Sequence, residues 1–294
     1  MLTVCILGGL GNQMYTYALY RTLLERGRDV YMDISCYNHQ NNPLLDHKEY
    51  ELADVFNITE RLAPKMSDLK YFMMRVVKKL KVPGLMNMHV DKTTHFQPEV
   101  LNLKSGILWG WWQSFKYSAE IENILRKEFT FKKPLTGKSA EVIDRIRNCN
   151  SVSISIRRGD YLNLSQIFNI LPVDYYTNAI NYIQERVPNA KFFCTSDDID
   201  WCKGAFSDRQ DFEFIDWSLG KDQYFDLQVI QECKHNILAN STFCLWGAWL
   251  NQNPEKIVIR PEKFFSDGRY RSERKDFWSE DWIVIPSQSE IDSK

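Results

Sequence analysis

The sequence predicts an α/β protein of two domains, each built on a parallel β-sheet with helices packed on it. Apolar, strand-like runs alternate with helical patterns, and the connections between them are short. The length of 294 residues suits two domains of roughly 150 residues each. A polar stretch with Pro and Gly at 132–138 separates the halves, so we expect domains at 1–140 and 141–294.

The composition excludes several classes of protein. Apolar residues make up 44% of the chain and charged residues 26%, which argues against intrinsic disorder. The chain has 37 basic and 38 acidic residues, a net charge of -1, and this balance argues against nucleic acid as a partner. The seven scattered cysteines predict neither a disulfide framework nor structural zinc. Because no basic leader precedes the first apolar run, we expect a cytoplasmic protein.

The first half opens with a β-loop-α-β unit. Residues 2–7 form an apolar strand, and a glycine-rich turn follows. The next helix carries Tyr17, Tyr20 and Leu24 on one face and ends near Gly27, before a second strand at 29–34.

Between residues 36 and 110 the clearest pattern is a helix over 69–82. An apolar stripe runs along it, with basic residues over the rest, including Lys78, Lys79 and Lys81. One interpretation is an amphipathic helix that rests on the inner membrane. The alternative is an ordinary surface helix of the first domain. The residues of the stripe are Leu69, Phe72, Met73, Val76 and Leu80.

The second half alternates strand and helix more regularly. We expect strands over 152–156, 191–195, 213–215, 235–239 and 256–259, and helices over 176–187, 199–206, 224–233 and 242–250. Ligands of open parallel sheets bind beyond the carboxyl ends of the strands. The residues that follow these strands are therefore the candidate site.

The glycine-rich turn is Gly8-Gly9-Leu10-Gly11-Asn12-Gln13. It resembles a dinucleotide-binding fingerprint, with Asp33 at the end of the second strand as a ribose-binding acid. Met14, however, occupies the position of the third glycine, which argues against an NAD-dependent oxidoreductase. The amides of Asn12 and Gln13 suit a polar, uncharged ligand such as a sugar. A tight turn with a structural role only is the alternative.

Two arginines, Arg157 and Arg158, directly follow the strand at 152–156. A guanidinium offers a planar fork of N–H donors that matches phosphate oxygens. The pair would concentrate positive charge where a diphosphate would lie, and Asp160 could hold one guanidinium in place. A buried Arg–Asp pair without a ligand is the alternative.

Acidic residues follow the next strand, at Asp197, Asp198 and Asp200. The spacing of Asp198 and Asp200 matches the Asp-x-Asp that holds a divalent metal and a nucleotide diphosphate in one class of glycosyltransferases. Alternatively, one carboxylate could accept hydrogen bonds from a guanine. A third interpretation is that a carboxylate only caps the following helix.

Two further segments could bind ligands. Asn240, Ser241 and Thr242 precede an apolar helix, whose free N–H groups would suit a phosphate. The aromatic cluster at 109–117 contains Trp112 and Gln113, where an indole could pack on a sugar ring and the amide could bind its hydroxyls. A tryptophan buried in the core is the alternative.

Taken together, these segments resemble the α-1,2-fucosyltransferases of glycosyltransferase family 11. The resemblance rests on Gly8–Met14, Ile156–Tyr161, Thr195–Asp198 and Cys233–Leu250, in the order of the family, with support from Trp112–Ser114. It implies a GT-B fold, with two facing Rossmann-like domains and parallel sheets. It also implies inverting transfer of L-fucose from GDP-β-L-fucose to O2 of a terminal β-galactoside, with no metal required.

The resemblance also implies roles for single residues. Arg157 would contact the β-phosphate. The base is not implied by the resemblance: a carboxylate suits that role, and the candidates by position are Asp160, near the arginines, and Asp33, at a strand end in the first domain. Ser155 stands where the family usually has a histidine, which puts one donor contact in question. The expected donor-binding residues are Arg157, Arg158, Asp197, Asp198, Asn240, Ser241 and Thr242, and the expected acceptor-binding residues are Asn12, Gln13, Trp112 and Gln113.

Three other functions stay open at this point. They are a metal-dependent glycosyltransferase that uses Asp198 and Asp200, an NAD-dependent oxidoreductase, and a sugar-binding protein without activity. The missing leader favours a bacterial enzyme, whose acceptor could be a lipid-linked precursor of a surface polysaccharide.

Overall fold

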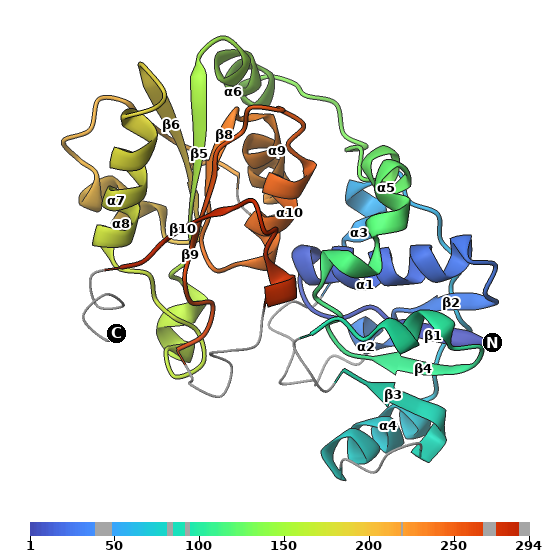
Figure 1. The fold of residues 1–294 in the computed structure, drawn as a ribbon. Helices are drawn as coiled ribbons and strands as arrows, with labels where there is room; N and C mark the ends of the chain where they lie inside the picture. The colour runs from blue at the N-terminus through green and yellow to red at the C-terminus, as the bar shows by residue number, and fades with distance from the viewer. Residues whose placement is uncertain (39–48, 81–84, 92–94, 219, 267–274, 288–294) are drawn as a thin grey trace. The chain divides into compact units, whose positions relative to one another are not determined.

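The computed structural model describes residues 1–38, 49–80, 85–91, 95–218, 220–266 and 275–287 (Figure 1). The chain divides into two compact units. The first contains Met1–Lys133 and Ser272–Ser279, and the second contains Pro134–Arg271 and Glu280–Lys294. The division falls earlier than residue 140, because helix α6 (Lys138–Arg147) packs its apolar side on the second unit. No helix is expected there from the sequence pattern.

The first unit contains a four-stranded sheet in the order β2-β1-β4-β3, with every pair parallel. The strands are β1 (Leu2–Cys5), β2 (Val30–Asp33), β3 (Met88–Val90) and β4 (Gly106–Trp109). The sequence predicts β1 and β2 but not β3 and β4, which are short and lie in a stretch without a clear alternation.

Helix α1 (Leu10–Glu25) follows β1 and is buried along most of its length. Helix α4 (Asp68–Leu80) confirms the expected helix, and residues 81–82 of that prediction lie outside the described residues. The remaining helices of this unit are short: α2 (Ser35–Asn38), α3 (Leu52–Val55), α5 (Glu122–Glu128) and the 3₁₀ segments Leu85–Asn87, Pro98–Asn102, Phe115–Tyr117, Ala119–Ile121 and Lys275–Phe277.

The second unit contains a six-stranded parallel sheet in the order β10-β9-β8-β5-β6-β7. The chain runs from β5 outward to β7 and then returns to the other side of β5 with β8. The point between β5 and β8 is therefore the topological switch point, where ligands of such sheets bind. The strands are β5 (Asn150–Ile156), β6 (Ala190–Ser196), β7 (Phe212–Phe214), β8 (His235–Ile237), β9 (Val258–Pro261) and β10 (Ile283–Ile285).

Helices cover both faces of this sheet, as the alternating pattern predicts. Figure 1 shows α7 and α8 on one face and α6, α9 and α10 on the other. The bounds are α7 (Val173–Gln184), α8 (Ile199–Ala205), α9 (Tyr224–Glu232) and α10 (Thr242–Leu250), with 3₁₀ segments at Asp160–Leu164 and Gly220–Asp222. Strands β5 to β9 and helices α7 to α10 lie within a few residues of their predicted ranges.

In the described ranges, none of the helices combines the length and the apolar composition that crossing a membrane requires.

Candidate active site

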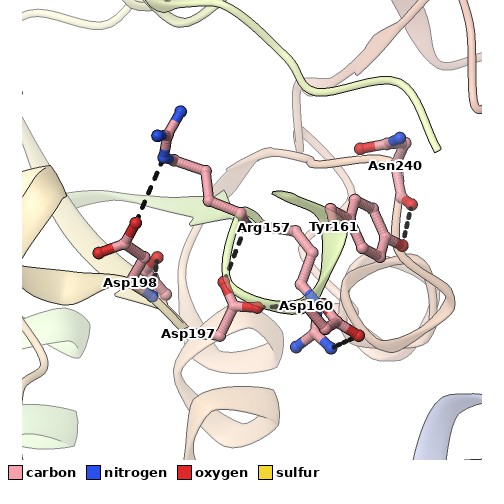
Figure 2. Close-up of polar contacts among 8 residues, drawn as sticks. Arg157, Asp160, Tyr161, Asp197, Asp198 and Asn240 are labelled. Atoms are coloured by element: carbon pink, nitrogen blue, oxygen red, sulfur yellow. Dashed lines mark hydrogen bonds and ion pairs between the residues drawn. The ribbon is translucent and has the colours of Figure 1, made fainter. Parts of the chain in front are cut away.

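Arg157 lies just beyond the carboxyl end of β5, held between two carboxylates (Figure 2). Its Nη2 donates to Asp160 Oδ2 over 2.8 Å, and its Nε lies 3.1 Å from Asp197 Oδ2. Burial alone lowers the pKa of Arg157, but the carboxylates of Asp197 and Asp160 outweigh that effect and raise it above its ordinary value. The guanidinium is therefore charged and fixed in direction.

Asp197 connects the two arginines. While Oδ2 faces Arg157, Oδ1 accepts the backbone N–H of Arg158 over 2.9 Å. A Cβ on Gly159 would lie 2.8 Å from Asp197 Oδ2, so the close approach of this carboxylate requires glycine there. Asp197 thus shapes the turn after β5, a role that the sequence does not reveal.

Arg158 is oriented by an acid and by an aromatic ring. Its Nε lies 3.3 Å from Asp198 Oδ2, and its Cζ lies 4.1 Å from the centre of the Trp201 ring. Stacking on an indole holds a guanidinium in a plane and leaves its edge available for hydrogen bonds. Trp201 is a site residue that no motif in the sequence indicates.

The sequence predicts an excess of positive charge at Arg157 and Arg158, and the structure does not show one. The two guanidiniums are paired with three carboxylates, those of Asp160, Asp197 and Asp198. The arginines instead offer directed donors. A guanidinium has five N–H groups, and because two of those on Arg157 are engaged, three remain for a ligand.

Asp198 also caps a helix. Its Oδ1 accepts the backbone N–H of Trp201 at the start of α8, and Asp200 lies in the first turn of the same helix. Both oxygens of Asp198 are therefore engaged, one with the backbone and one with Arg158. Within the described residues, no group of three or more His, Cys, Asp or Glu side chains is arranged to hold a metal ion.

Asn240 follows β8, on the other side of the switch point, and its side chain is buried. Its Nδ2 donates to the carbonyls of Asn169 and Phe264 over 2.8 and 2.7 Å, and its own carbonyl accepts from Tyr161 Oη over 2.9 Å (Figure 2). The amide nitrogen of Asn240 therefore ties together the loops around the site. Its Oδ1 has no hydrogen-bond partner within the described residues, and the expected contact of Asn240 with the donor substrate stays a prediction.

Ser241 and Thr242 begin α10 and are partly exposed. Ser241 occupies the N-cap position, but its side chain makes no capping hydrogen bond. The first N–H groups of a helix have no partner within the helix and carry partial positive charge. The structure places the start of a helix where the sequence predicts it, and phosphate binding there stays a prediction.

Ser155 is buried near the end of β5, beside Thr195 of β6. The two hydroxyl oxygens lie 3.5 Å apart. The residue in the position of the family histidine therefore faces a strand neighbour, and its short side chain brings no ring to the site.

In the first unit, Gln13 has a structural role in place of the expected acceptor contact. The residue is fully buried in α1. Its Nε2 donates to the carbonyls of Gly8 and Glu49, and its Oε1 accepts the N–H groups of Glu51 and Leu52. The amide links the turn after β1 to a segment far along the chain, and no donor or acceptor is left for a sugar.

Asn12 and Gln113 meet beyond the carboxyl ends of β1 and β4. Gln113 Nε2 donates to Asn12 Oδ1 over 2.7 Å, and both side chains are partly exposed. The structure brings these two predicted residues together although they are far apart in sequence.

The exposed indole in this region is that of Trp111, not Trp112. Trp112 is 1% exposed and packs edge-to-face on Tyr117, whereas Trp111 is 37% exposed. The ring of Trp111 lies over Gly8, where a Cβ would come within 2.8 Å of Cζ3 and 2.9 Å of Asn12 Nδ2. Gly8 also has a φ of +74°, so the turn favours glycine for both reasons.

Asp33 ends β2 and is buried. Its Oδ1 accepts the N–H of Ser35 over 2.8 Å, and its Oδ2 lies 4.0 Å from Cys5 Sγ. These contacts fix the turn into α2, which gives Asp33 a structural role in place of the predicted base.

The sequence profile described as glycosyl transferase family 11 matches residues 1–286. An α-1,2-colitosyltransferase of Escherichia coli is 32% identical over 95% of this chain and 96% of its own length. The O-antigen biosynthesis glycosyltransferase WbnK of E. coli is 28% identical over 93% and 98%. A galactoside α-(1,2)-fucosyltransferase 2 of Oryctolagus cuniculus is 22% identical over 90% and 75%.

The fold is also found among solved structures. That of the α-1,6-fucosyltransferase NodZ soaked with GDP-fucose matches 88% of this chain and 94% of its own with a TM-score of 0.54, at 13% identity. Two α/β units with parallel sheets and this likeness place the chain in the GT-B class. With the family profile matched over nearly its whole length, the chain belongs to glycosyltransferase family 11 and is a glycosyltransferase.

Proposed function

We propose that the protein transfers L-fucose from GDP-β-L-fucose to O2 of a terminal galactoside, with inversion at the anomeric carbon. The observation that carries the proposal is the position of Arg157 beside the switch point of the second sheet. The start of α10 lies after the neighbouring strand, β8. Directed N–H donors on both sides of one point suit a diphosphate. The names of two family relatives supply the α-1,2 linkage.

The second unit binds the donor in this proposal. Three N–H groups of Arg157 and the first amides of α10 contact the β-phosphate, and the free edge of Arg158 contacts the nucleotide. Asp197 and Asp160 act as positioning residues, since both hold the guanidinium of Arg157. Charge-assisted hydrogen bonds of this kind contribute about 1.5–3 kcal/mol each.

At the anomeric carbon, the reaction forms one bond and breaks one. The acceptor O2 attacks the anomeric carbon, and the bond from that carbon to the phosphate oxygen breaks, with its electron pair leaving on GDP. Arg157 and the start of α10 stabilise that growing negative charge. The acceptor proton passes to a base. Asp33 contacts Ser35 and Cys5 through its two oxygens, whereas Asp160 has Oδ2 on Arg157 and Oδ1 without a hydrogen-bond partner among the described residues, so Asp160 is the better candidate base of the two.

The first unit binds the acceptor, with Trp111 in place of Trp112 as the aromatic platform. An indole that is partly exposed offers its face to the C–H groups of a sugar ring, and the amides of Asn12 and Gln113 beside it offer hydrogen bonds to hydroxyls.

The first experiment determines which sugar the enzyme transfers. Because one family relative is named an α-1,2-colitosyltransferase, we take GDP-colitose as the second candidate donor. Colitose is the 3-deoxy form of fucose. We expect faster GDP release from GDP-fucose than from GDP-colitose in the presence of lactose, and NMR of the product should show an α-1,2 linkage. Preference for GDP-colitose would overturn the assignment of the donor.

The same assay tests the role of a metal. We expect full activity in EDTA, because both oxygens of Asp198 are engaged with the protein. Loss of activity in EDTA and its recovery with Mg²⁺ or Mn²⁺ would favour the metal-dependent alternative that uses Asp198 and Asp200.

The acceptor side is tested with Trp111→Ala. We expect a higher KM for the galactoside and an unchanged KM for GDP-fucose. Trp249, partly exposed on α10 of the second unit, provides a matched control as Trp249→Phe, which should leave the acceptor KM at the wild-type value. An acceptor KM unchanged in Trp111→Ala would show that the indole is not the platform.

A further inference from the structure

Helix α4 carries apolar side chains on two faces. Tyr71, Met74 and Val77 are buried and join a core cluster with residues of the first sheet. On the other face lie Leu69, Phe72 and Met73, which are 73%, 60% and 42% exposed. Figure 1 shows α4 beside β3, at the edge of the first sheet. The apolar stripe that the sequence predicts is therefore not the stripe that packs in the core.

The exposed stripe is unusual for this protein. Leu69 and Phe72 are the two most exposed large apolar side chains in the part of the chain that the structure describes. Because residues three and four apart are neighbours on a helix surface, Leu69, Phe72 and Met73 form one continuous patch. Such a patch marks a contact surface more often than scattered single residues do.

Most of the charged residues near this patch in the sequence are basic. Lys65, just before α4, is exposed, and Arg75 on the helix is partly exposed. The sequence adds lysines at 70, 78 and 79, whereas Asp68 is the only acid between residues 65 and 80. An apolar helix face with cations beside it is the pattern of a helix that lies in the plane of an anionic lipid surface.

We propose that the exposed face of α4, formed by Leu69, Phe72 and Met73, docks on an anionic phospholipid bilayer. The three apolar side chains enter the interface between headgroups and acyl chains, and the basic residues contact the headgroups. A second copy of the chain fits this face less well, because two α4 helices would bring like charges together. The proposal is independent of the sugar that the enzyme transfers.

The test is sedimentation of the full chain with vesicles of phosphatidylcholine alone or of phosphatidylcholine mixed with phosphatidylglycerol. We expect binding to the mixed vesicles, and loss of that binding at high salt. A double variant, Leu69→Gln with Phe72→Gln, should bind at least about tenfold more weakly, which corresponds to about 1.4 kcal/mol. Since both side chains are exposed, its melting temperature and its turnover with a soluble acceptor should match the wild type.

The matched control is Val284→Gln, which removes an exposed apolar side chain from β10 in the second unit and should bind vesicles as the wild type does. The proposal fails if the wild type sediments equally with neutral and mixed vesicles, or if the double variant still binds the mixed ones. It also fails if the wild type is a dimer in solution that the double variant converts to monomer, because the face is then an interface between copies.

Discussion

Replacing Arg157 with alanine should abolish most of the catalytic rate while leaving the fold intact. Three of its five N–H groups remain for a ligand once Asp160 and Asp197 are satisfied. Loss of one preorganised donor to a developing oxyanion lowers kcat by about 10²–10³, or about 3–4 kcal/mol. With several donors lost together, we expect a fall in kcat at the upper end of that range or beyond it.

The effect of Arg157→Ala on stability should be much smaller. The variant leaves Asp160 and Asp197 without their partner, but their side chains are 34% and 15% exposed, so water can solvate them. Partly exposed ion pairs contribute no more than about 1 kcal/mol each. Arg157→Lys should recover part of the rate, because an ammonium restores the charge without the planar fork.

The assay is steady-state GDP release at saturating acceptor, with a thermal melt of each variant. Arg209→Ala is the matched control, because Arg209 is also paired with an aspartate, stacks on aromatic rings and is equally exposed at 27% in the same unit. If Arg157→Ala keeps kcat within about tenfold of the wild type, a loss of no more than about 1.4 kcal/mol, Arg157 does not stabilise the leaving group.

Three further predictions test other parts of the structure. Gly159→Ala should lower kcat with little change in melting temperature, because its Cβ would displace the carboxylate of Asp197; a wild-type rate would contradict this. Gln13→Ala should lower the free energy of unfolding in urea by about 2–4 kcal/mol, since four backbone groups lose a buried partner; a change within error would refute the structural role. Burial raises the pKa of Asp226 from 3.8 to about 7, against the opposing effect of its hydrogen bond from Ser218. The folded state then holds a proton that the unfolded state has lost, so stability should fall by at most about 4 kcal/mol as pH rises from about 4 to 7. Asp226→Asn should flatten that dependence, and an unchanged slope would exclude Asp226 as its source.

Most of the second unit could be predicted from the sequence because short strand-like runs alternate regularly with helical patterns, with turn residues between them. Strands β3 and β4 could not, since each is short and lies in a stretch of the sequence without a clear alternation. The helix α6 was missed for another reason. Only three of its side chains, Val142, Ile143 and Ile146, are buried, and they join a core cluster that includes residues of β6 and α9.

The sequence indicated which segments contribute to the candidate site, but not which of their side chains are exposed there and which are buried. Trp111 and Trp112 are adjacent in a cluster of aromatic residues, and the sequence alone does not indicate which of the two side chains is exposed. The backbone conformation of Trp112 determines which indole is buried. Its φ of +48° is rare for a residue with a side chain, and its N–H donates to Asp91 Oδ2. Gln13 is a similar case, because its partners at 49–52 are brought to it only by the tertiary fold.

The pairing of the arginines changes the physical account of donor binding. Two guanidiniums that face three carboxylates give no excess of positive charge, so long-range attraction of a diphosphate cannot be what the motif provides. The carboxylates of Asp160 and Asp197 instead fix the orientation of the Arg157 guanidinium. A guanidinium held at Nε by Asp197 and at Nη2 by Asp160 cannot rotate without breaking a charged hydrogen bond. Its remaining donors therefore already point one way before charge develops on the leaving group, and little reorganisation is needed during the reaction.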